Sequence, residues 1–231
     1  MNRHVIVRTI DRADASVVDE LGTVGTASVH EAIGRIGYVG PHIVPIQQGT
    51  KIAGSAVTVL SHPGDNLMIH AAIEVCRPGD VMVVVNTAPS THGMFGDLLA
   101  TSLKARGVKG LIIDAGCRDV ATLKEMGFPV WSRAISAKGT VKATLGAVNI
   151  PVVCAGVNVE PGDAVVADDD GVVVVPRKYA TATAAKAQKR FDDEDAKRKK
   201  LSSGVLGLDM YNMREPLAKA GLIYVDNPED A

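Results

Sequence analysis

Gly107-Val-Lys-Gly-Leu-Ile-Ile-Asp-Ala-Gly-Cys-Arg-Asp119 is the stretch that decides the fold. Its apolar run at 111–113 is flanked by glycines, and it predicts a strand buried on both faces of a sheet. Residues 114–116 predict the turn that ends this strand. Arg118 and Asp119 follow side by side, at the strand end where open α/β sheets bind ligands. This pair predicts a site for an anionic substrate and a hard metal ion. The alternative is a helix-capping Asp beside a solvated Arg.

A second strand and a helix precede this stretch. Val81 to Val85 is continuously apolar, and Gly96 and Asp97 then open a predicted helix. Free backbone N–H groups at a helix N-terminus attract carboxylates and phosphates, and a glycine lets a ligand approach the backbone closely. We therefore expect two neighbouring strand ends to combine an anion-binding helix start with an Arg-Asp pair. Asp97 is expected to cap its helix in either case.

The order of elements around these strands predicts a mainly parallel sheet. A β-α-β-α-β run, which favours parallel strands with right-handed crossovers, extends from residue 81 to residue 135. Three short strands nearer the C-terminus, separated by tight turns, predict an antiparallel meander at 151–154, 164–167 and 172–175. The predicted fold class is therefore α/β with mixed sheets.

Polar residues mark two predicted helix starts near the N-terminus. Asp11 is expected to cap a short helix, and Ser28-Val-His-Glu31 has the spacing of a capping box. His30 is an alternative candidate for a site, and its role stays open at this stage.

The composition changes towards the C-terminus. Residues 1–176 are expected to form a single α/β domain that carries the active site. Residues 178–200 are rich in Ala, Lys and acidic residues, which favours a solvated helix. Because residues 201–224 have apolar positions of their own, we expect residues 177–231 to form a helical extension that packs on a neighbouring subunit.

The composition of the chain indicates which binding partners and which cellular compartment to expect. The formal net charge is −1 and aromatic residues make up 3% of the chain, so neither a basic field nor a base-stacking surface predicts nucleic-acid binding. No apolar run approaches the ~20 residues that span a bilayer, and no signal peptide is evident. The three cysteines are odd in number, which favours reduced thiols and a cytoplasmic location.

These motifs together resemble the metal-dependent pyruvate aldolases that act on 4-hydroxy-4-methyl-2-oxoglutarate and 4-carboxy-4-hydroxy-2-oxoadipate. The resemblance rests mainly on residues 96–107 and 110–119, with supporting strings at 62–66, 128–133, 167–176 and 207–211. It implies a swivelling β/β/α layered fold with a C-terminal helical extension. It also implies a homo-oligomer, either a trimer or a hexamer, with sites between subunits.

The resemblance also implies roles for individual residues. Arg118 and Asp119 correspond to the catalytic pair, with Arg118 on the substrate and Asp119 on a divalent cation, Mg²⁺ or Mn²⁺. Glu194 of a neighbouring subunit is implied as a second acidic group that holds the metal through water. The implied substrate-binding residues are Gly96, Asp97, Leu98, Leu99 and Arg118. No side-chain base is evident, and the roles of His62 and His92 stay open.

The implied activity is a class II aldolase that releases pyruvate from a 2-oxo-4-hydroxy dicarboxylate or tricarboxylate, with oxaloacetate decarboxylation as a side activity. This activity belongs to bacterial breakdown of protocatechuate or gallate. The competing Schiff-base mechanism needs a lysine at a strand end, and Lys104, Lys109 and Lys124 are not predicted there. The alternative function is that of a related non-enzyme, the regulator of ribonuclease activity A, which lacks the metal-binding aspartate. The presence of Asp119 favours the enzyme.

Overall fold

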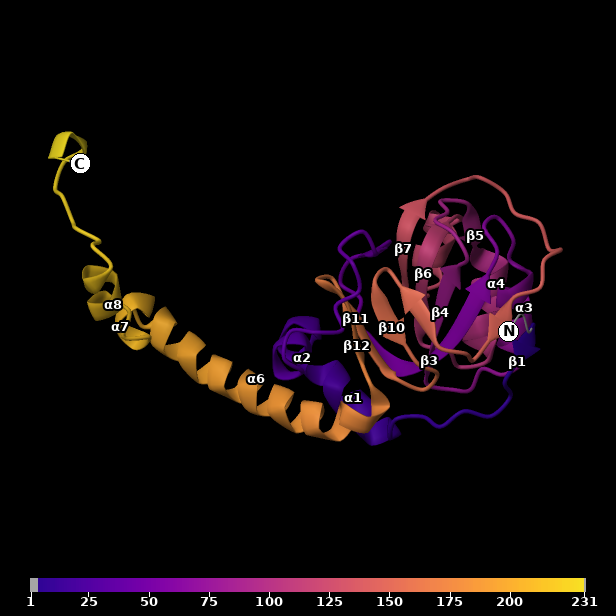
Figure 1. Ribbon diagram of the computed structural model, residues 1–231, viewed down its shortest axis with the longest axis horizontal. Helices are drawn as coiled ribbons and strands as arrows, with labels where there is room; N and C mark the ends of the chain where they lie inside the picture. Colours follow the sequence, from indigo (N-terminus) through magenta and orange to yellow (C-terminus); the bar gives the residue numbers. More distant parts are fainter. Residues whose placement is uncertain (1–3, 231) are drawn as a thin grey trace. The chain divides into compact units, whose positions relative to one another are not determined.

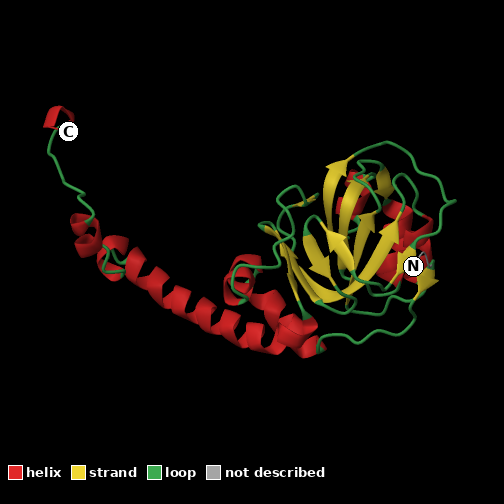
Figure 2. Cartoon of the chain, in the orientation of Figure 1, coloured by secondary structure: helices red, strands yellow, loops and turns green. Residues whose placement is uncertain are grey.

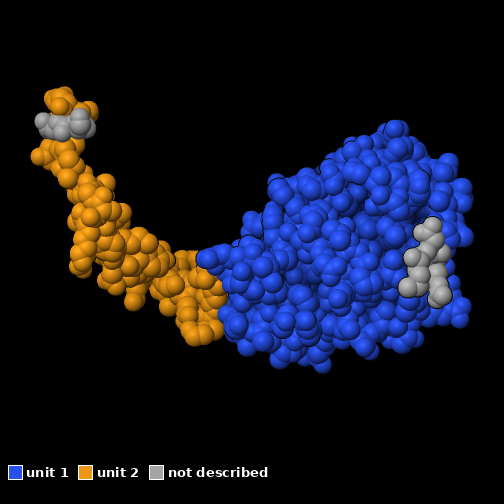
Figure 3. All heavy atoms as spheres, viewed as in Figure 1, with its two compact units in different colours: residues 1–188 blue, residues 189–231 orange. Residues whose placement is uncertain are grey.

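The computed structural model describes residues 4–230, which divide into two compact units, Met1–Gln188 and Lys189–Ala231 (Figure 3). The first unit extends beyond the boundary expected at residue 176. The reason is that α6 (Ala180–Ser202) begins inside it, where Ala180, Ala184 and Ala187 join a hydrophobic core.

A mixed sheet forms the centre of the first unit (Figure 1). The pairs β3–β4, β4–β6 and β6–β7 are all parallel, as the β-α-β-α-β pattern predicted. β1, β8 and β2 complete the order β1-β8-β3-β4-β6-β7-β2. The strands of this path are β1 (Val5–Ile6), β2 (Val44–Pro45), β3 (Ile52–Ser61), β4 (Asp80–Asn86), β6 (Gly110–Cys117), β7 (Val130–Ile135) and β8 (Ala147–Val148).

A second group of strands lies against this sheet. β11 (Ala164–Asp168) and β12 (Gly171–Val175) form an antiparallel hairpin, and β11 also pairs antiparallel with the start of β3. Among residues 4–230, β9 (Val152–Cys154) pairs only with β10 (Val157–Val159), a strand that the sequence did not predict. The predicted meander of three strands is therefore wrong for the strand at 151–154, which does not pair with the other two.

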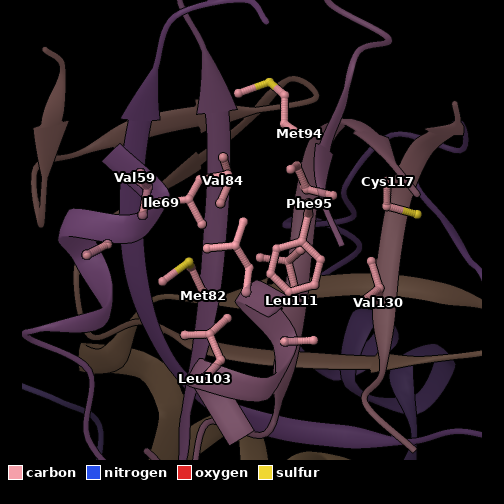
Figure 4. Close-up of a cluster of buried hydrophobic side chains, with 14 of the residues drawn as sticks. Val59, Ile69, Met82, Val84, Met94, Phe95, Leu103, Leu111, Cys117 and Val130 are labelled. Carbon is pink, nitrogen blue, oxygen red and sulfur yellow. The ribbon is translucent and has the colours of Figure 1, made fainter. Parts of the chain in front are cut away.

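Helices cover both sides of these strands (Figure 2). On one side α3 (Leu67–Ile73), α4 (Asp97–Ala105) and α5 (Val120–Glu125) pack on the central sheet, around the side chains drawn in Figure 4. On the other side α1 (Ala15–Val24), α2 (Thr26–Ala32) and the first turns of α6 pack on β11 and β12. A third apolar cluster fills the space between the two groups of strands. The layered α/β fold with mixed pairing and a C-terminal helix is thus confirmed.

The predicted helix starts near the N-terminus need correction. Asp14, not Asp11, caps α1, because its Oδ1 accepts a hydrogen bond from Ser16 N at 2.9 Å. α2 begins after Gly25, and its first amide, Thr26 N, donates to Asp168 Oδ2 at 2.9 Å. The predicted capping box is therefore wrong, since Ser28 already lies within the helix.

The strand β6 is longer than predicted. Residues 114–116 do not form a turn, because β5 (Gly93–Phe95) pairs with the end of β6 and extends it to Cys117. The side chain of Asp114 accepts a hydrogen bond from Arg133 Nε at 2.6 Å. The chain leaves the strand after Cys117, and Arg118 and Asp119 form the connection to α5.

The second unit contains the rest of α6, then α7 (Gly207–Met210), α8 (Arg214–Lys219) and a short 3-10 turn, η2 (Pro228–Asp230). None of the residues 189–229 is buried within the chain. Its exposed large apolar side chains are Phe191, Leu201, Val205, Leu206, Tyr211, Met213, Leu222, Ile223, Tyr224 and Val225. Over residues 4–230, no helix combines the length and apolar character required to cross a membrane.

Candidate active site

The two predicted segments of the site meet at the ends of β5 and β6. Gly96 follows β5 and occupies the N-cap position of α4, while Arg118 and Asp119 connect β6 to α5. The backbone N–H of Arg118 donates to Phe95 O at 2.8 Å, which ties the two connections together. The structure therefore brings together the residues that the sequence placed at neighbouring strand ends.

Asp119 is held in an unusual backbone conformation. Its φ of 57° lies in the left-handed region, which non-glycine residues adopt at an energetic cost and often at functional sites. Although Asp119 occupies the N-cap position of α5, its side chain makes no capping hydrogen bond. The alternative of a plain capping Asp is therefore wrong, and the carboxylate is available for another partner.

The carboxylate of Asp119 lies against both the arginine and the start of α4. Its Oδ2 atom is 3.5 Å from Arg118 Nε and 3.4 Å from the backbone N of Asp97. Its Oδ1 atom makes no hydrogen bond or ion pair with any residue among 4–230. The Asp119 side chain is 37% exposed, so a cation can reach it.

Gly96 makes this close approach possible. A Cβ at this position would lie 2.2 Å from Asp119 Oδ2 and 3.3 Å from Arg118 Nε. Its backbone is extended, with φ −156°, a conformation that any residue can adopt. The glycine is therefore required for space beside the carboxylate and not for its backbone conformation.

The first turn of α4 carries the amides that were expected to bind an anion, and the first of them, Asp97 N, already donates to Asp119 Oδ2. Gly96, not Asp97, is the N-cap residue, so the predicted capping role of Asp97 is wrong. Asp97 instead accepts a hydrogen bond from Leu98 N at 2.8 Å. Leu98 is 79% exposed and Leu99 is buried, so this turn lies at the surface and is anchored by its third residue.

These residues line a small pocket together with residues that the sequence analysis missed. The pocket has a volume of about 150 Å³, and a shallower hollow of about 410 Å³ also borders Arg118 and Asp119. The pocket residues that were missed are Asn66, His70, Met94 and Lys142. Only Asn66 lies within a string quoted for the family resemblance, and no local pattern marks the other three.

His70 and Lys142 influence each other in this pocket. Partial desolvation lowers the pKa of His70, although the residue is exposed, and the positive charge of Lys142 lowers it further. His70 is therefore neutral at pH 7, while Lys142 is a charged group on the pocket wall.

The residues present fit a magnesium-type ion. Residues 4–230 contain no group of three or more His, Cys, Asp or Glu side chains able to enclose a metal. Magnesium is commonly bound by one or two carboxylates together with water and substrate oxygens. Asp119 offers one such carboxylate with a free oxygen, beside a glycine whose missing side chain leaves room for it.

Other candidate groups are placed less favourably for catalysis. Cys117 is buried, and this burial raises the pKa of its thiol, so a nucleophilic thiolate is not expected. Lys104 donates to Met126 O, and Lys109 pairs with Asp19 at 2.7 Å. Lys124 lies within α5, so none of the three lysines follows a strand end.

The remaining predicted residues lie elsewhere. His92 Nδ1 is 3.0 Å from Ser90 Oγ, and His30 packs edge-on against Tyr38. His62 is exposed. Glu194 belongs to the second unit, where it pairs with Arg190 at 2.9 Å, and its role at a neighbouring subunit's site stays a prediction.

A larger cavity, of about 480 Å³, lies away from this site. Two of its charged side chains are already engaged: Asp163 accepts hydrogen bonds from Glu160 N and Arg177 N, and Arg177 donates to Pro161 O. It is therefore a weaker candidate for substrate chemistry than the pocket beside Asp119.

Known proteins share this fold and this sequence pattern. The sequence profile of the aldolase/RraA family matches residues 15–174. The chain belongs to this family. A protein of Halalkalibacterium halodurans, provisionally named a 4-hydroxy-4-methyl-2-oxoglutarate aldolase, is 29% identical over 202 residues, which cover 87% of this chain and 96% of that protein.

Solved structures of other proteins share this fold. An uncharacterized protein from Pseudomonas syringae pv. tomato matches with a TM-score of 0.75 and 29% identity, over 85% of this chain and 97% of that chain. Streptomyces coelicolor RraAS2 matches with a TM-score of 0.73 and 31% identity, over 82% of this chain and 100% of that chain. It is described as an unusual member of the RNase ES inhibitor RraA protein family, so the family includes both aldolase and inhibitor names.

Proposed function

We propose that this chain is a divalent-metal-dependent lyase that cleaves 2-oxo-4-hydroxy acids between C3 and C4 and releases pyruvate. The proposed substrates are 4-hydroxy-4-methyl-2-oxoglutarate, which yields two pyruvates, and 4-carboxy-4-hydroxy-2-oxoadipate, which yields pyruvate and oxaloacetate. Oxaloacetate decarboxylation is the proposed side activity, and bacterial breakdown of protocatechuate or gallate is the proposed context. The observation that carries the proposal is the position of the Asp119 carboxylate. It makes no capping hydrogen bond to α5, and it lies beside Arg118 at the start of α4.

Each residue of the site has a role in this reaction. Asp119 would hold Mg²⁺ or Mn²⁺, and the ion, when bound, supplies a Lewis acid for the 2-oxo acid end of the substrate. Arg118 neutralises the negative charge that develops on the 2-oxo oxygen when the C3–C4 bond breaks. The amides at the start of α4 bind the adjacent carboxylate. Cleavage converts the C4 hydroxyl into a carbonyl as its proton passes to water, and a proton returned from water to C3 of the enolate completes pyruvate.

A pyruvate-release assay tests this function directly. We expect both aldols to be cleaved, the activity to disappear with a chelator, and added Mg²⁺ or Mn²⁺ to restore it. Oxaloacetate should also lose carbon dioxide under the same metal requirement. Trapping of a substrate–lysine adduct by borohydride would instead support Schiff-base chemistry and exclude this mechanism.

The second candidate function is that of a ribonuclease-regulator-like binding protein. The similarity to RraAS2 is the observation that favours it. This candidate predicts stable binding to the nuclease and no metal-dependent release of pyruvate. The two assays, performed on one preparation, separate the candidates.

We also infer that the chain forms a homo-oligomer through its second unit. A helical unit this small, with no residue of 189–229 buried within the chain, has too little core to be stable without a partner. A neighbouring copy is the proposed partner, and this packing would bring Glu194 to the site beside Asp119.

Truncation tests this assembly. Removing residues after Val175 would also remove core residues such as Ala184, so the informative variant ends at Gln188. This variant is expected to lose both the oligomer and pyruvate release while retaining a cooperative thermal unfolding transition, although its helical circular dichroism signal should fall with the helices removed. Cleavage by a truncated monomer at the full-length rate would show that one subunit contains the whole site.

A further inference from the structure

Lys142, an exposed cation at the active-site pocket, has no ion-pair partner among residues 4–230. Lys142 lines the pocket together with Gly96, Asp97 and Arg118. No carboxylate among residues 4–230 lies within 4.0 Å of its Nζ atom. A lysine with no structural ion pair in a small pocket is available for an anionic group of a ligand.

The backbone on both sides of Lys142 is firmly held. Asp65 Oδ2 accepts hydrogen bonds from Ala143 N at 2.9 Å and from Thr144 N at 2.6 Å. On the other side of Lys142, Val141 O accepts from Asn66 N at 3.0 Å and Val141 N donates to Gly64 O at 3.0 Å. The loop that carries Lys142 is therefore fixed to the turn before α3 at four points.

The buried Asp65 carboxylate is suited to this role. Burial alone would raise the pKa of Asp65, but the amides of Leu67, Ala143 and Thr144 outweigh it and hold the pKa below its ordinary value. Asp65 therefore stays charged at neutral pH and keeps the loop in place. Asp65 is a positioning residue for Lys142.

Asn66 is a second polar residue of the pocket. Asn66 is 6% exposed, and its Oδ1 atom has no hydrogen-bond partner among the residues of the structure. Its Nδ2 atom donates to Met94 O at 3.2 Å, which fixes the orientation of the amide.

The charges of the pocket balance a dianion. Asp97 and Asp119 contribute two negative charges and a divalent ion offsets them, while His70 is neutral. The positive charges of Arg118 and Lys142 then remain, and Glu194 of a neighbouring subunit would not change this balance, because it is paired with Arg190 at 2.9 Å. A 2-oxo acid with one carboxylate neutralises only one of them, whereas a 2-oxo dicarboxylate neutralises both.

We propose that Lys142 is a specificity-determining residue that binds the second carboxylate, the one at the far end of a 2-oxo dicarboxylate, while Arg118 and the start of α4 bind the 2-oxo acid end. This inference rests on the proposed function, because it assumes that the pyruvoyl end of the substrate lies beside Asp119. It adds a selection rule: acids that lack the second carboxylate are poor ligands.

Calorimetry with a matched pair of ligands tests this rule without turnover. 2-Oxoglutarate has both carboxylates, 2-oxopentanoate lacks the second, and neither has the C4 hydroxyl that cleavage requires. In buffer with Mg²⁺, we expect the full-length protein to bind 2-oxoglutarate about tenfold to a hundredfold more tightly, as a charge-assisted contact provides. Lys142→Gln should abolish this preference and leave the Kd for 2-oxopentanoate unchanged.

The matched control is Lys138→Gln, because Lys138 is exposed in the same loop region and does not line the pocket. This variant should keep the preference. Equal binding of the two ligands by the unmodified protein, or an unchanged preference in Lys142→Gln, would overturn the proposal. A preference for 2-oxoglutarate without any pyruvate release would refute the aldolase function and support the role of Lys142. Pyruvate release without this preference would support the aldolase function and refute the role of Lys142.

Discussion

Replacement of Gly96 by alanine is the sharpest perturbation that the site offers. The added Cβ would lie 2.2 Å from Asp119 Oδ2, whereas real Cβ contacts are essentially never shorter than 3.0 Å. The carboxylate would therefore have to move by about 0.8 Å, and the Arg118 side chain, 3.3 Å away at Nε, would have to shift with it. A misplacement of about 1 Å at a reacting centre can cost on the order of 10²-fold in rate.

The same substitution should spare the fold. Gly96 has an extended backbone, so alanine adds no backbone strain. We expect kcat/KM for pyruvate release to fall about a hundredfold and Mn²⁺ affinity, measured by electron paramagnetic resonance, to fall with it. Because alanine is a poorer N-cap than glycine, the melting temperature should fall, but by no more than about 4 °C.

Gly139→Ala is the matched control, because a Cβ at Gly139 would meet no atom within 4 Å. It should retain the activity and the metal affinity of the unmodified protein. Unchanged kcat/KM and Mn²⁺ affinity in Gly96→Ala would refute the argument that Asp119, in the position seen here, holds the metal.

Three further substitutions test other parts of the site. Asp119→Asn keeps the shape but removes the charge, so we expect turnover and Mn²⁺ binding to be lost with an unchanged circular dichroism spectrum. Arg118→Lys replaces a planar fork with a point charge, so kcat/KM should fall by about 10²–10³ while metal affinity persists. Asp65→Asn should lower the free energy of unfolding in urea by about 2–3 kcal/mol at pH 7, because buried amides lose a charged acceptor. Because the folded-state pKa of Asp65 is lowered, its contribution is complete above its ordinary pKa of about 3.9. The difference between the two proteins should therefore shrink as the pH falls below about 4, and a constant difference down to pH 3 would contradict this assignment.

The local sequence pattern was sufficient to predict the parts of the site that are formed by short continuous segments of the chain. The apolar runs that became β4 and β6 are buried on both faces, and such strands are recognisable from composition alone. The glycine that opens α4 and the Arg-Asp pair after β6 each lie directly after a strand. Since parallel strands end at the same edge of a sheet, their meeting could be predicted without knowing any long-range contact.

The mistakes arose where a distant segment changes the local outcome. β6 continues through 114–116 because β5 pairs with its end, and this partner lies more than twenty residues earlier in the chain. α2 begins at Thr26 because Asp168, which is 142 residues away, accepts a hydrogen bond from its first amide. In both cases the sequence around the affected element contains no pattern that predicts its distant partner.

The pocket is formed partly by short continuous segments and partly by a loop that is held by distant residues. This difference affects how substrate specificity can vary between members of the family. The pyruvoyl end would be bound by 96–99 and 118–119, two short strings at strand ends. Lys142 lies in a Gly- and Thr-rich loop and is placed only through hydrogen bonds from that loop to Asp65, about 80 residues earlier in the chain. A change in this loop can therefore alter recognition of the far carboxylate and leave both short strings intact. Two aldolase/RraA family members with identical residues at 96–99 and 118–119 can then share the chemistry at C3 and C4 and still differ in the acids that they accept.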